Sequence, residues 1–212
     1  SDTVISSVGI QNTFSKLLKN TDNVNSFTNK IKTLKPSFGH ACLYVGFNQS
    51  AKDLGIQDTN QWIYSSYDHD DTTKTYMNDE KSPFPVVYIS FPSSKDPDWD
   101  TNHPNSATLE AIVPTSFSMY NKWTKKTWKK RGVEYESYKE ELSQRIIKHI
   151  YSNNPHLKDK ISYYELSTPL STRDMANYQF GELYGMDHNP ERFRQKWLKP
   201  KTPIKGFYLT GQ

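Results

Sequence analysis

The feature that most constrains the fold of this 212-residue chain is a series of short apolar runs, each four to seven residues long. The runs are rich in Val, Ile, Tyr and Phe, which favour β-strands. Polar segments with Gly, Pro, Asn or Asp separate many of them. Seven strands are predicted on this basis: Thr3–Val8, Ala41–Phe47, Gln61–Ser66, Pro85–Phe91, Ala107–Val113, Ile161–Leu166 and Gly206–Leu209.

Helical spacing is clear in two segments. Glu134–Tyr151 repeats Tyr or an aliphatic residue every three or four positions, with charges between them, as an amphipathic helix does. Phe117–Trp128 is aromatic and basic. Since the strands outnumber the helices and do not alternate with them, we predict the α+β class: a mixed, largely antiparallel sheet with helices on one face.

Composition narrows the functional classes. Aromatic residues make up 14% of the chain, which suits a globular protein and also a broad apolar binding surface. The net charge of +4 is mild, and with no nucleic-acid motif present we expect no nucleic-acid partner. The single cysteine, Cys42, excludes an internal disulfide and a Cys-pair zinc site.

Common sequence motifs for cofactors and metals are absent from the chain. The nine glycines never fall two positions apart, so the dinucleotide fingerprint GxGxxG is absent. Walker A, HExxH and GxSxG are absent too. Around His69 the sequence YDHDD groups possible metal ligands, but an acidic, solvated turn explains them better, and no metal site is predicted.

The richest stretch for chemistry is GELYGMDHNPERF, from Gly181 to Phe193. Its two glycines let the backbone turn sharply or approach a ligand, and Tyr184 lies between them. Asp187 and His188 are adjacent titratable groups, and a carboxylate near an imidazole tunes it as a proton donor. The pattern alone favours a simpler interpretation, in which Asp-His-Asn-Pro is a turn that caps a following helix.

A second stretch, SFSMYNKWTKKTWKKRG (Ser116 to Gly132), mixes aromatic rings with lysines. A helix over Phe117–Trp128 would either lie on a membrane surface or pack on the core with a lysine-covered outer face. Both interpretations stay open at this point.

Three blocks resemble a known family: YISFPSSKDPDWDTNHPNSATLEAIVP, GELYGMDHNPERF and TPIKGFYLTGQ. They are similar to the FAD-dependent retinol saturases (all-trans-retinol 13,14-reductases), within the wider family of phytoene desaturases and carotenoid isomerases. The opening DTVISSVGIQNTF is similar to a segment that follows the first flavin-binding part. The resemblance spans nearly the whole chain.

The resemblance implies that residues 1–212 are the substrate-binding portion of a larger flavoprotein, like the substrate domain of amine-oxidase-type enzymes, with the flavin (Rossmann) domain lying outside this sequence. It implies FAD in the whole protein, NAD(P)H as a possible electron donor, and a lipophilic small-molecule substrate. A fragment lacking the fingerprint is expected to bind FAD weakly and to be inactive.

The family's site residues transfer to individual positions. Thr210, Gly211 and Gln212 match the start of the second flavin-contacting segment, and Gly185 follows the Tyr184 that matches a family Tyr-Gly beside the flavin. Tyr184, Asp187 and His188 are thereby the candidate catalytic residues.

Two functions follow as hypotheses. The first is part of an FAD-dependent oxidoreductase that saturates, desaturates or isomerises carbon–carbon double bonds of a retinoid, carotenoid or related isoprenoid. The second is a stand-alone module that binds an apolar ligand or a membrane surface without catalysis.

Overall fold

The computed structural model describes residues 1–19 and 24–211, and the chain forms two compact units. One unit consists of Ser1–Gly39 together with Thr172–Gln212, and the other of His40–Ser171. Each has its own cluster of buried apolar side chains, as an independently stable unit requires. The sequence predicts one substrate-binding portion over residues 1–212, and the structure contains two units within that range.

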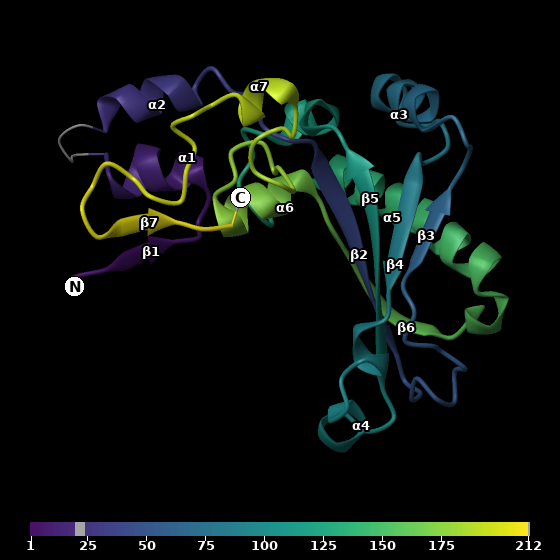
Figure 1. Cartoon of the computed structure of the whole chain (residues 1–212). Coiled ribbons are helices and arrows are strands. Elements are labelled where there is room, and N and C mark those ends of the chain that lie inside the picture. The colour runs from purple at the N-terminus through teal and green to yellow at the C-terminus, as the bar shows by residue number, and fades with distance from the viewer. Residues whose placement is uncertain (20–23, 212) are drawn as a thin grey trace. The chain divides into compact units, whose positions relative to one another are not determined.

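The unit His40–Ser171 is built on a five-stranded sheet with the strand order β3-β4-β5-β2-β6 (Figure 1). Three neighbouring pairs, β3 with β4, β4 with β5 and β2 with β6, run antiparallel. With the helices described below, the predicted α+β class is confirmed. The strands are β2 (Gly39–Phe47), β3 (Gln61–Tyr64), β4 (Val86–Ser90), β5 (Ala107–Thr115) and β6 (Ile161–Ser167).

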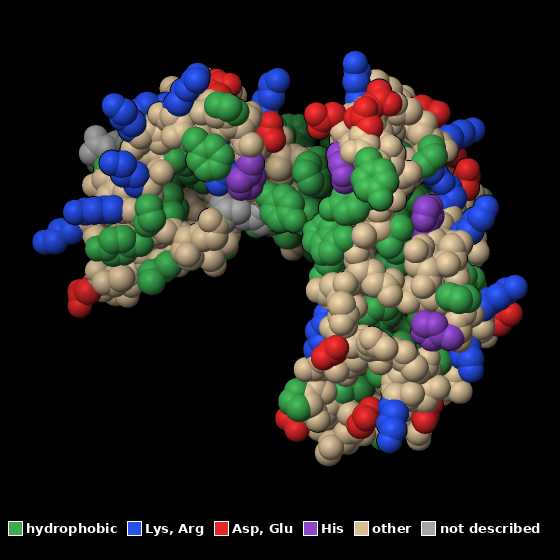
Figure 2. All heavy atoms as spheres, turned by 45° about the vertical axis from the view of Figure 1, so that its right-hand side comes forward, with side chains coloured by type: hydrophobic (Ala, Val, Ile, Leu, Met, Phe, Trp, Pro, Cys, Tyr) green, Lys and Arg blue, Asp and Glu red, His purple; other side chains and the backbone are tan. Residues whose placement is uncertain are grey.

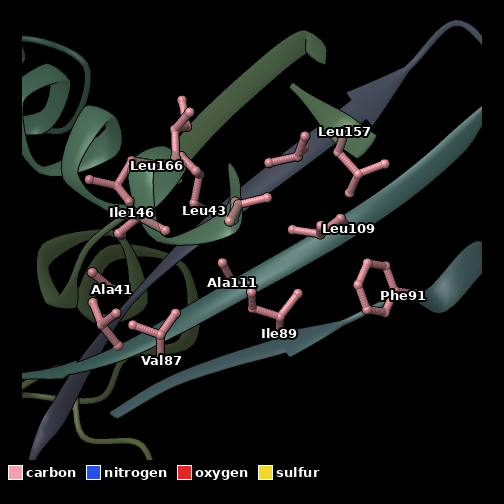
Figure 3. Close-up of a cluster of buried hydrophobic side chains, with 14 of the residues drawn as sticks. Ala41, Leu43, Val87, Ile89, Phe91, Leu109, Ala111, Ile146, Leu157 and Leu166 are labelled. Carbon is pink, nitrogen blue, oxygen red and sulfur yellow. The ribbon is translucent and has the colours of Figure 1, made fainter. Parts of the chain in front are cut away.

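Strand β5 shows why these residues form a sheet with one buried face. Its side chains alternate strictly between buried and partly exposed positions, because successive side chains of a strand point to opposite faces. Leu109, Ala111 and Val113 are fully buried, and they meet Leu43 of β2 and Ile89 of β4 in one core cluster (Figure 3).

The longest helix, α5 (Val133–Asn153), packs on this buried face. Its Leu142, Ile146 and Ile150 belong to the same core cluster as the inward side chains of the strands. Burial of one such aliphatic side chain contributes about 1.5–3 kcal/mol. The helix predicted over Glu134–Tyr151 is therefore confirmed, with one residue more at its start and two at its end.

The remaining helices of this unit are short. Asp68 accepts a hydrogen bond from the Asp71 amide at 3.0 Å and so caps one of them, which places the YDHDD segment at a helix start. The short helices are α3 (His69–Asn78), η2 (Pro92–Ser94), α4 (Trp99–Asn102), η3 (Phe117–Trp123) and η4 (Pro155–Leu157), while α6 spans Pro169–Ala176.

The helix predicted over Phe117–Trp128 is wrong in extent and type. The chain forms a 3₁₀-helix that ends at Trp123. Tyr120 and Trp123 are buried, and Trp123 contacts the rings of Tyr135 and Tyr138 at 5.2 and 5.1 Å. Both rings are buried in the core. The residues that directly follow Trp123 are polar, so no buried apolar face continues the helix beyond it.

The other unit pairs the two ends of the chain. Strands β1 (Val4–Ser6) and β7 (Phe207–Leu209) lie parallel in a two-stranded sheet (Figure 1). Beside them lie α1 (Ile10–Asn12), which continues as the π-helix η1 (Thr13–Leu17), α2 (Asn25–Ile31) and α7 (Pro190–Phe193). The core of this unit centres on Phe14, whose ring stacks on Phe27 at 5.1 Å.

Candidate functional site

Strands β1 and β7 belong to the unit that contains both chain ends, and their carboxyl ends lie at the same edge of that unit. The two strands are in register, with Ser6 opposite Leu209, and the Thr210 amide donates to the Ser6 carbonyl oxygen at 2.9 Å. Each strand then runs into a glycine in the left-handed region, Gly9 with φ of 83° and Gly211 with φ of 77°. A side chain rarely tolerates this conformation, so glycine is needed at both places.

A pocket of about 520 Å³ opens at this edge. Gly9, Thr210 and Gly211 form part of its wall, and Ile10, Met186 and Leu209 are among its apolar lining. Arg192 and Lys199 also line it and bring positive charge. The pocket thus combines exposed backbone, apolar walls and two cations, which together suit a flat ligand that carries phosphate.

The candidate cofactor residues distribute around this pocket. Thr210 and Gly211 line it directly. Gly185 lines a second, very small cavity that shares Gly9, Ile10 and Met186 with the first. Gln212 lies outside the described residues.

The segment that carries the candidate catalytic residues is held by a distant part of the chain. The Tyr184 amide donates to Ser37 Oγ at 2.9 Å, and the Ser37 amide donates to the Gly185 carbonyl oxygen at 2.8 Å. Leu183 and Asp187 make further backbone bonds to the same segment, from Lys35 to Phe38. This irregular antiparallel pairing fixes the backbone on both sides of Tyr184.

The three candidate catalytic side chains make different contacts. Tyr184 is 48% exposed, and its ring meets that of His188 edge-on, with centroids 6.0 Å apart. The Asp187 carboxylate accepts a hydrogen bond from the side-chain amide nitrogen of Asn189, Nδ2, at 3.1 Å. Arg192 Nη1 lies 3.2 Å from His188 Nε2, within hydrogen-bond distance, and a guanidinium acts only as a donor. The structure thus brings Tyr184 and His188 together and pairs Asp187 with Asn189.

The capping role weighed for this segment is also present. Asn189 Oδ1 accepts from the Arg192 amide at 3.0 Å, so Asn189 caps α7, and Glu191 lies in the first turn of that helix. Asp187 and His188 precede the cap, and the Asp187 carboxylate contacts the side chain of the capping residue.

One titratable residue of this motif was missed by the sequence analysis. Glu182 is only 3% exposed and accepts from the Phe180 amide at 2.8 Å. Burial raises the pKa of its carboxyl group. It lines the small cavity together with Gly185 and Gly9. Its burial comes from tertiary packing, and nothing in the local sequence GELYG signals it.

The second candidate surface is the outer face of the five-stranded sheet. Side chains that point away from α5 include Tyr44, Trp62 and Tyr163, which are 45%, 59% and 61% exposed. Trp62 packs against Tyr88 of the neighbouring strand with ring centroids 4.6 Å apart. Figure 2 shows hydrophobic side chains gathered on this unit below the acidic group at its top. An antiparallel sheet usually presents polar residues on its solvent side, so this aromatic face suggests a binding surface.

Among residues 1–19 and 24–211, no three His, Cys, Asp or Glu side chains gather in a way that would hold a metal ion. In the same part of the chain, no helix combines the length and apolar character needed to cross a bilayer.

Comparison with known proteins gives relatives along the whole chain, although no protein-family model matches it. The chain is 31% identical to all-trans-retinol 13,14-reductase of Rattus norvegicus and 26% identical to that of Homo sapiens. It is 28% identical to an inactive all-trans-retinol 13,14-reductase of Danio rerio. Each alignment covers 99% of this chain and 36% of the relative, so the chain spans about a third of the length of these proteins. The resemblance that the sequence blocks predicted, to the retinol saturase family, is confirmed along the whole chain.

Proposed function

We propose that this chain is part of an FAD-dependent oxidoreductase that reduces a carbon–carbon double bond of a retinoid, or of a related isoprenoid such as a carotenoid. The observation that carries the proposal is the pocket at the ends of β1 and β7, bounded by Gly9 and Gly211. It belongs to a chain whose relatives are named retinol 13,14-reductases. Desaturation and isomerisation involve related bond changes on the same class of substrate.

The residues of the pocket fit part of a flavin nucleotide. Gly9 lines the pocket with φ of 83°, and a Cβ atom added there would stand 3.0 Å from the Tyr178 ring, so the position suits glycine. Thr210 and Gly211 would bring backbone close to the cofactor, while Arg192 and Lys199 would neutralise phosphate charge. Bound FAD supplies hydride chemistry. NAD(P)H is proposed as the electron donor of the whole protein.

The outer aromatic face of the sheet is the proposed substrate surface. A polyene offers no charge, so its site must be apolar and aromatic-lined, with few polar groups. Tyr44, Trp62 and Tyr163 provide such a lining.

A double-bond reduction also needs a proton at one carbon, and Tyr184, Asp187 and His188 are proposed to hold or position it. Tyr184 is the best placed of the three, since its ring is half exposed and its backbone is fixed by Ser37. His188 touches the Tyr184 ring and would orient it. Asp187 would act through Asn189, which its carboxylate contacts.

A second function, binding of an apolar ligand without catalysis, is favoured by one observation. One relative at 28% identity is named as an inactive reductase. Similarity at this level is therefore found both to proteins named reductases and to one named inactive.

The test uses the whole natural protein that contains this chain. It is purified and examined for flavin absorbance, then incubated with all-trans-retinol or a carotenoid and NAD(P)H, and the products are analysed by mass for the gain of two hydrogens. A yellow protein that forms the saturated product is expected. A protein that is colourless and takes up no added FAD would rule out the flavin proposal, and polyene binding by that protein would establish the second function.

A matched pair of variants tests the pocket itself. Gly211→Val is expected to lower FAD occupancy strongly, because a side chain would enter the cavity wall. Gly55→Val carries a similar left-handed φ, 69° against 77°, but Gly55 does not line this pocket. It should therefore leave flavin content unchanged. Equal flavin content in the two variants would remove Gly211 from the site.

A further inference from the structure

The segment from the end of the short helix η3 to the start of α5 is strongly basic. Residues 122–133, KWTKKTWKKRGV, contain five lysines and one arginine and no acidic residue. This segment is here called the lysine loop. Its positive charge exceeds the net charge of the whole chain, which is only +4. Such a concentration marks a surface for an anionic partner.

The geometry of the lysine loop places an aromatic ring among these charges. The Lys130 amide donates to the Thr127 carbonyl oxygen at 3.0 Å, which closes a turn with Trp128 and Lys129 at its centre. Lys129 adopts φ of 59°, the left-handed value that the third position of a type II turn requires. Trp128 is 46% exposed and Val133 is 83% exposed.

The base of the lysine loop is anchored. Trp123 is 1% exposed and packs between Tyr135 and Tyr138. Lys126 Nζ donates to the Arg131 carbonyl oxygen at 3.0 Å and so crosses the loop. The turn with Trp128 therefore projects from a fixed base, which lowers the entropy lost when it binds a partner.

The neighbouring helix α5 brings acidic side chains, and three of them contact other residues of the chain. Glu134 pairs with Lys122 at 2.6 Å, and Glu136 lies 3.8 Å from Lys139. Glu140 accepts hydrogen bonds from Gln144 and Tyr164. These contacts occupy the acidic side chains, while Lys125, Lys129 and Lys130 remain exposed.

We propose that the lysine loop binds the surface of an anionic lipid bilayer, with Trp128 at the level of the headgroups. Lys125, Lys129 and Lys130 would face the lipid phosphates. Each lysine near such a surface is worth about 1 kcal/mol, and tryptophan is enriched at the membrane–water boundary. A nucleic acid or an acidic protein would also satisfy the lysines, but a bilayer surface offers phosphates to the lysines and an apolar region to the exposed side chains of Trp128 and Val133.

This proposal keeps Trp128 of the membrane contact predicted over Phe117–Trp128 and adds the lysines around it. Tyr120 and Trp123 of that range are buried and are unavailable to lipid. The contact moves to the turn that follows them. It is independent of flavin chemistry and would hold for a protein without catalytic activity.

The experiment is co-sedimentation of the whole natural protein with vesicles of phosphatidylcholine, with and without phosphatidylserine. Binding is expected only with phosphatidylserine and should weaken in high salt. Changing Lys125, Lys129 and Lys130 together to Gln should lower the affinity by roughly a hundredfold. The control changes three exposed lysines of the same unit, Lys52, Lys74 and Lys158, to Gln, and should lower it far less. Equal losses would show that only bulk charge matters and would overturn the proposal.

The aromatic contribution is tested separately. Trp128→Ser should weaken vesicle binding about tenfold, whereas Tyr67→Ser, at the fully exposed Tyr67, should leave it unchanged. Thermal unfolding of both variants should match the parent protein.

A local measurement covers the case in which another part of the longer protein also binds lipid. Hydrogen exchange of peptides from residues 124–133 should slow when phosphatidylserine vesicles are added. Unchanged exchange there in protein that sediments with vesicles would overturn the proposal, as would binding to heparin or DNA with none to vesicles.

Discussion

The amide of Thr210 donates a hydrogen bond of 2.9 Å to the carbonyl oxygen of Ser6, which joins the end of β7 to the end of β1. The bond brings residues from opposite ends of the sequence to one pocket edge. Gly211 follows directly and lines the pocket. The architecture of the proposed cofactor pocket therefore depends on this parallel pair, and its stability is open to direct test.

Two glycines of this strand segment form a matched pair for the first prediction. Gly206 and Gly211 share φ of 77°, but an added Cβ would lie 2.4 Å from the Asp2 carbonyl oxygen at Gly206 and 3.9 Å from that of Ser7 at Gly211. Alanine at either position costs roughly 1–2 kcal/mol for the left-handed backbone. Gly206→Ala must also displace backbone, so its loss of unfolding free energy should be clearly larger.

Urea unfolding of the two variants measures this difference, and hydrogen exchange of the Val4 amide reports it locally. That amide donates to the Gly206 carbonyl oxygen at 2.8 Å, so its protection should fall in Gly206→Ala. Equal stability of the two variants would contradict the close packing of β1 against the turn before β7.

The sequence predicts the sheet and α5 well because their signals are local. Alternation in Ala107–Val113 and the helical repeat of Glu134–Tyr151 depend on neighbouring residues alone. Each of the seven predicted strands overlaps an observed strand. The α+β class is therefore predictable from the sequence pattern. Burial of one face produces an apolar residue at every second position of a strand and at every third or fourth position of a helix.

The site is less predictable because its geometry depends on distant contacts. Tyr184 is positioned by Ser37, 147 residues away along the chain, and Glu182 is buried by packing that no local pattern shows. The aromatic spacing of Phe117–Trp128 indicates a longer helix, yet the chain turns at Lys129 once Trp123 has entered the core. The family resemblance supplied the candidate residues, and pairing of remote segments decides which of them meet.

A second prediction contrasts the two tryptophans of that region. Trp123 is 1% exposed between Tyr135 and Tyr138, so Trp123→Ala should lower the unfolding free energy by about 3–5 kcal/mol. Trp128→Ala should change it by less than about 0.5 kcal/mol. Trp123→Phe should cost less than Trp123→Ala, since it keeps a ring and removes an indole N–H that has no hydrogen-bond partner among the described residues. Chemical denaturation measures all three, and a stable Trp123→Ala protein would refute the burial.

A third prediction concerns pH and the buried carboxyl group of Glu182. Burial raises its pKa in the folded state above the ordinary 4.5, so the folded unit binds the proton more tightly than the unfolded chain does. The contribution of Glu182 to the free energy of unfolding is therefore greatest below the ordinary pKa. It falls as the pH rises through the raised pKa.

Glu182→Gln removes this titration and keeps an oxygen for the Phe180 amide. The stability of the variant relative to the parent should therefore improve as pH rises from about 4 to 7. Exposed Glu141 gives the control, because Glu141→Gln should show a nearly constant difference. Unfolding curves across this range measure both, and parallel pH profiles for the two variants would mean that Glu182 is solvated.

The last prediction separates the substrate surface from the lysine loop. Trp62 is 59% exposed on the outer face of the sheet and rests on Tyr88. If this face binds a polyene, Trp62→Ser should weaken retinol binding roughly tenfold, since about 1–2 kcal/mol of apolar contact is lost. Unfolding free energy should change little, because most of the ring is already in water.

Trp128→Ser is the reciprocal control, because it removes an exposed tryptophan from the lysine loop and leaves the sheet intact. It should retain retinol affinity and weaken vesicle binding, while Trp62→Ser should do the reverse. Retinol fluorescence in detergent measures the first property and co-sedimentation the second. Loss of both properties in either variant would mean that one surface serves ligand and membrane together, because separate surfaces must respond separately.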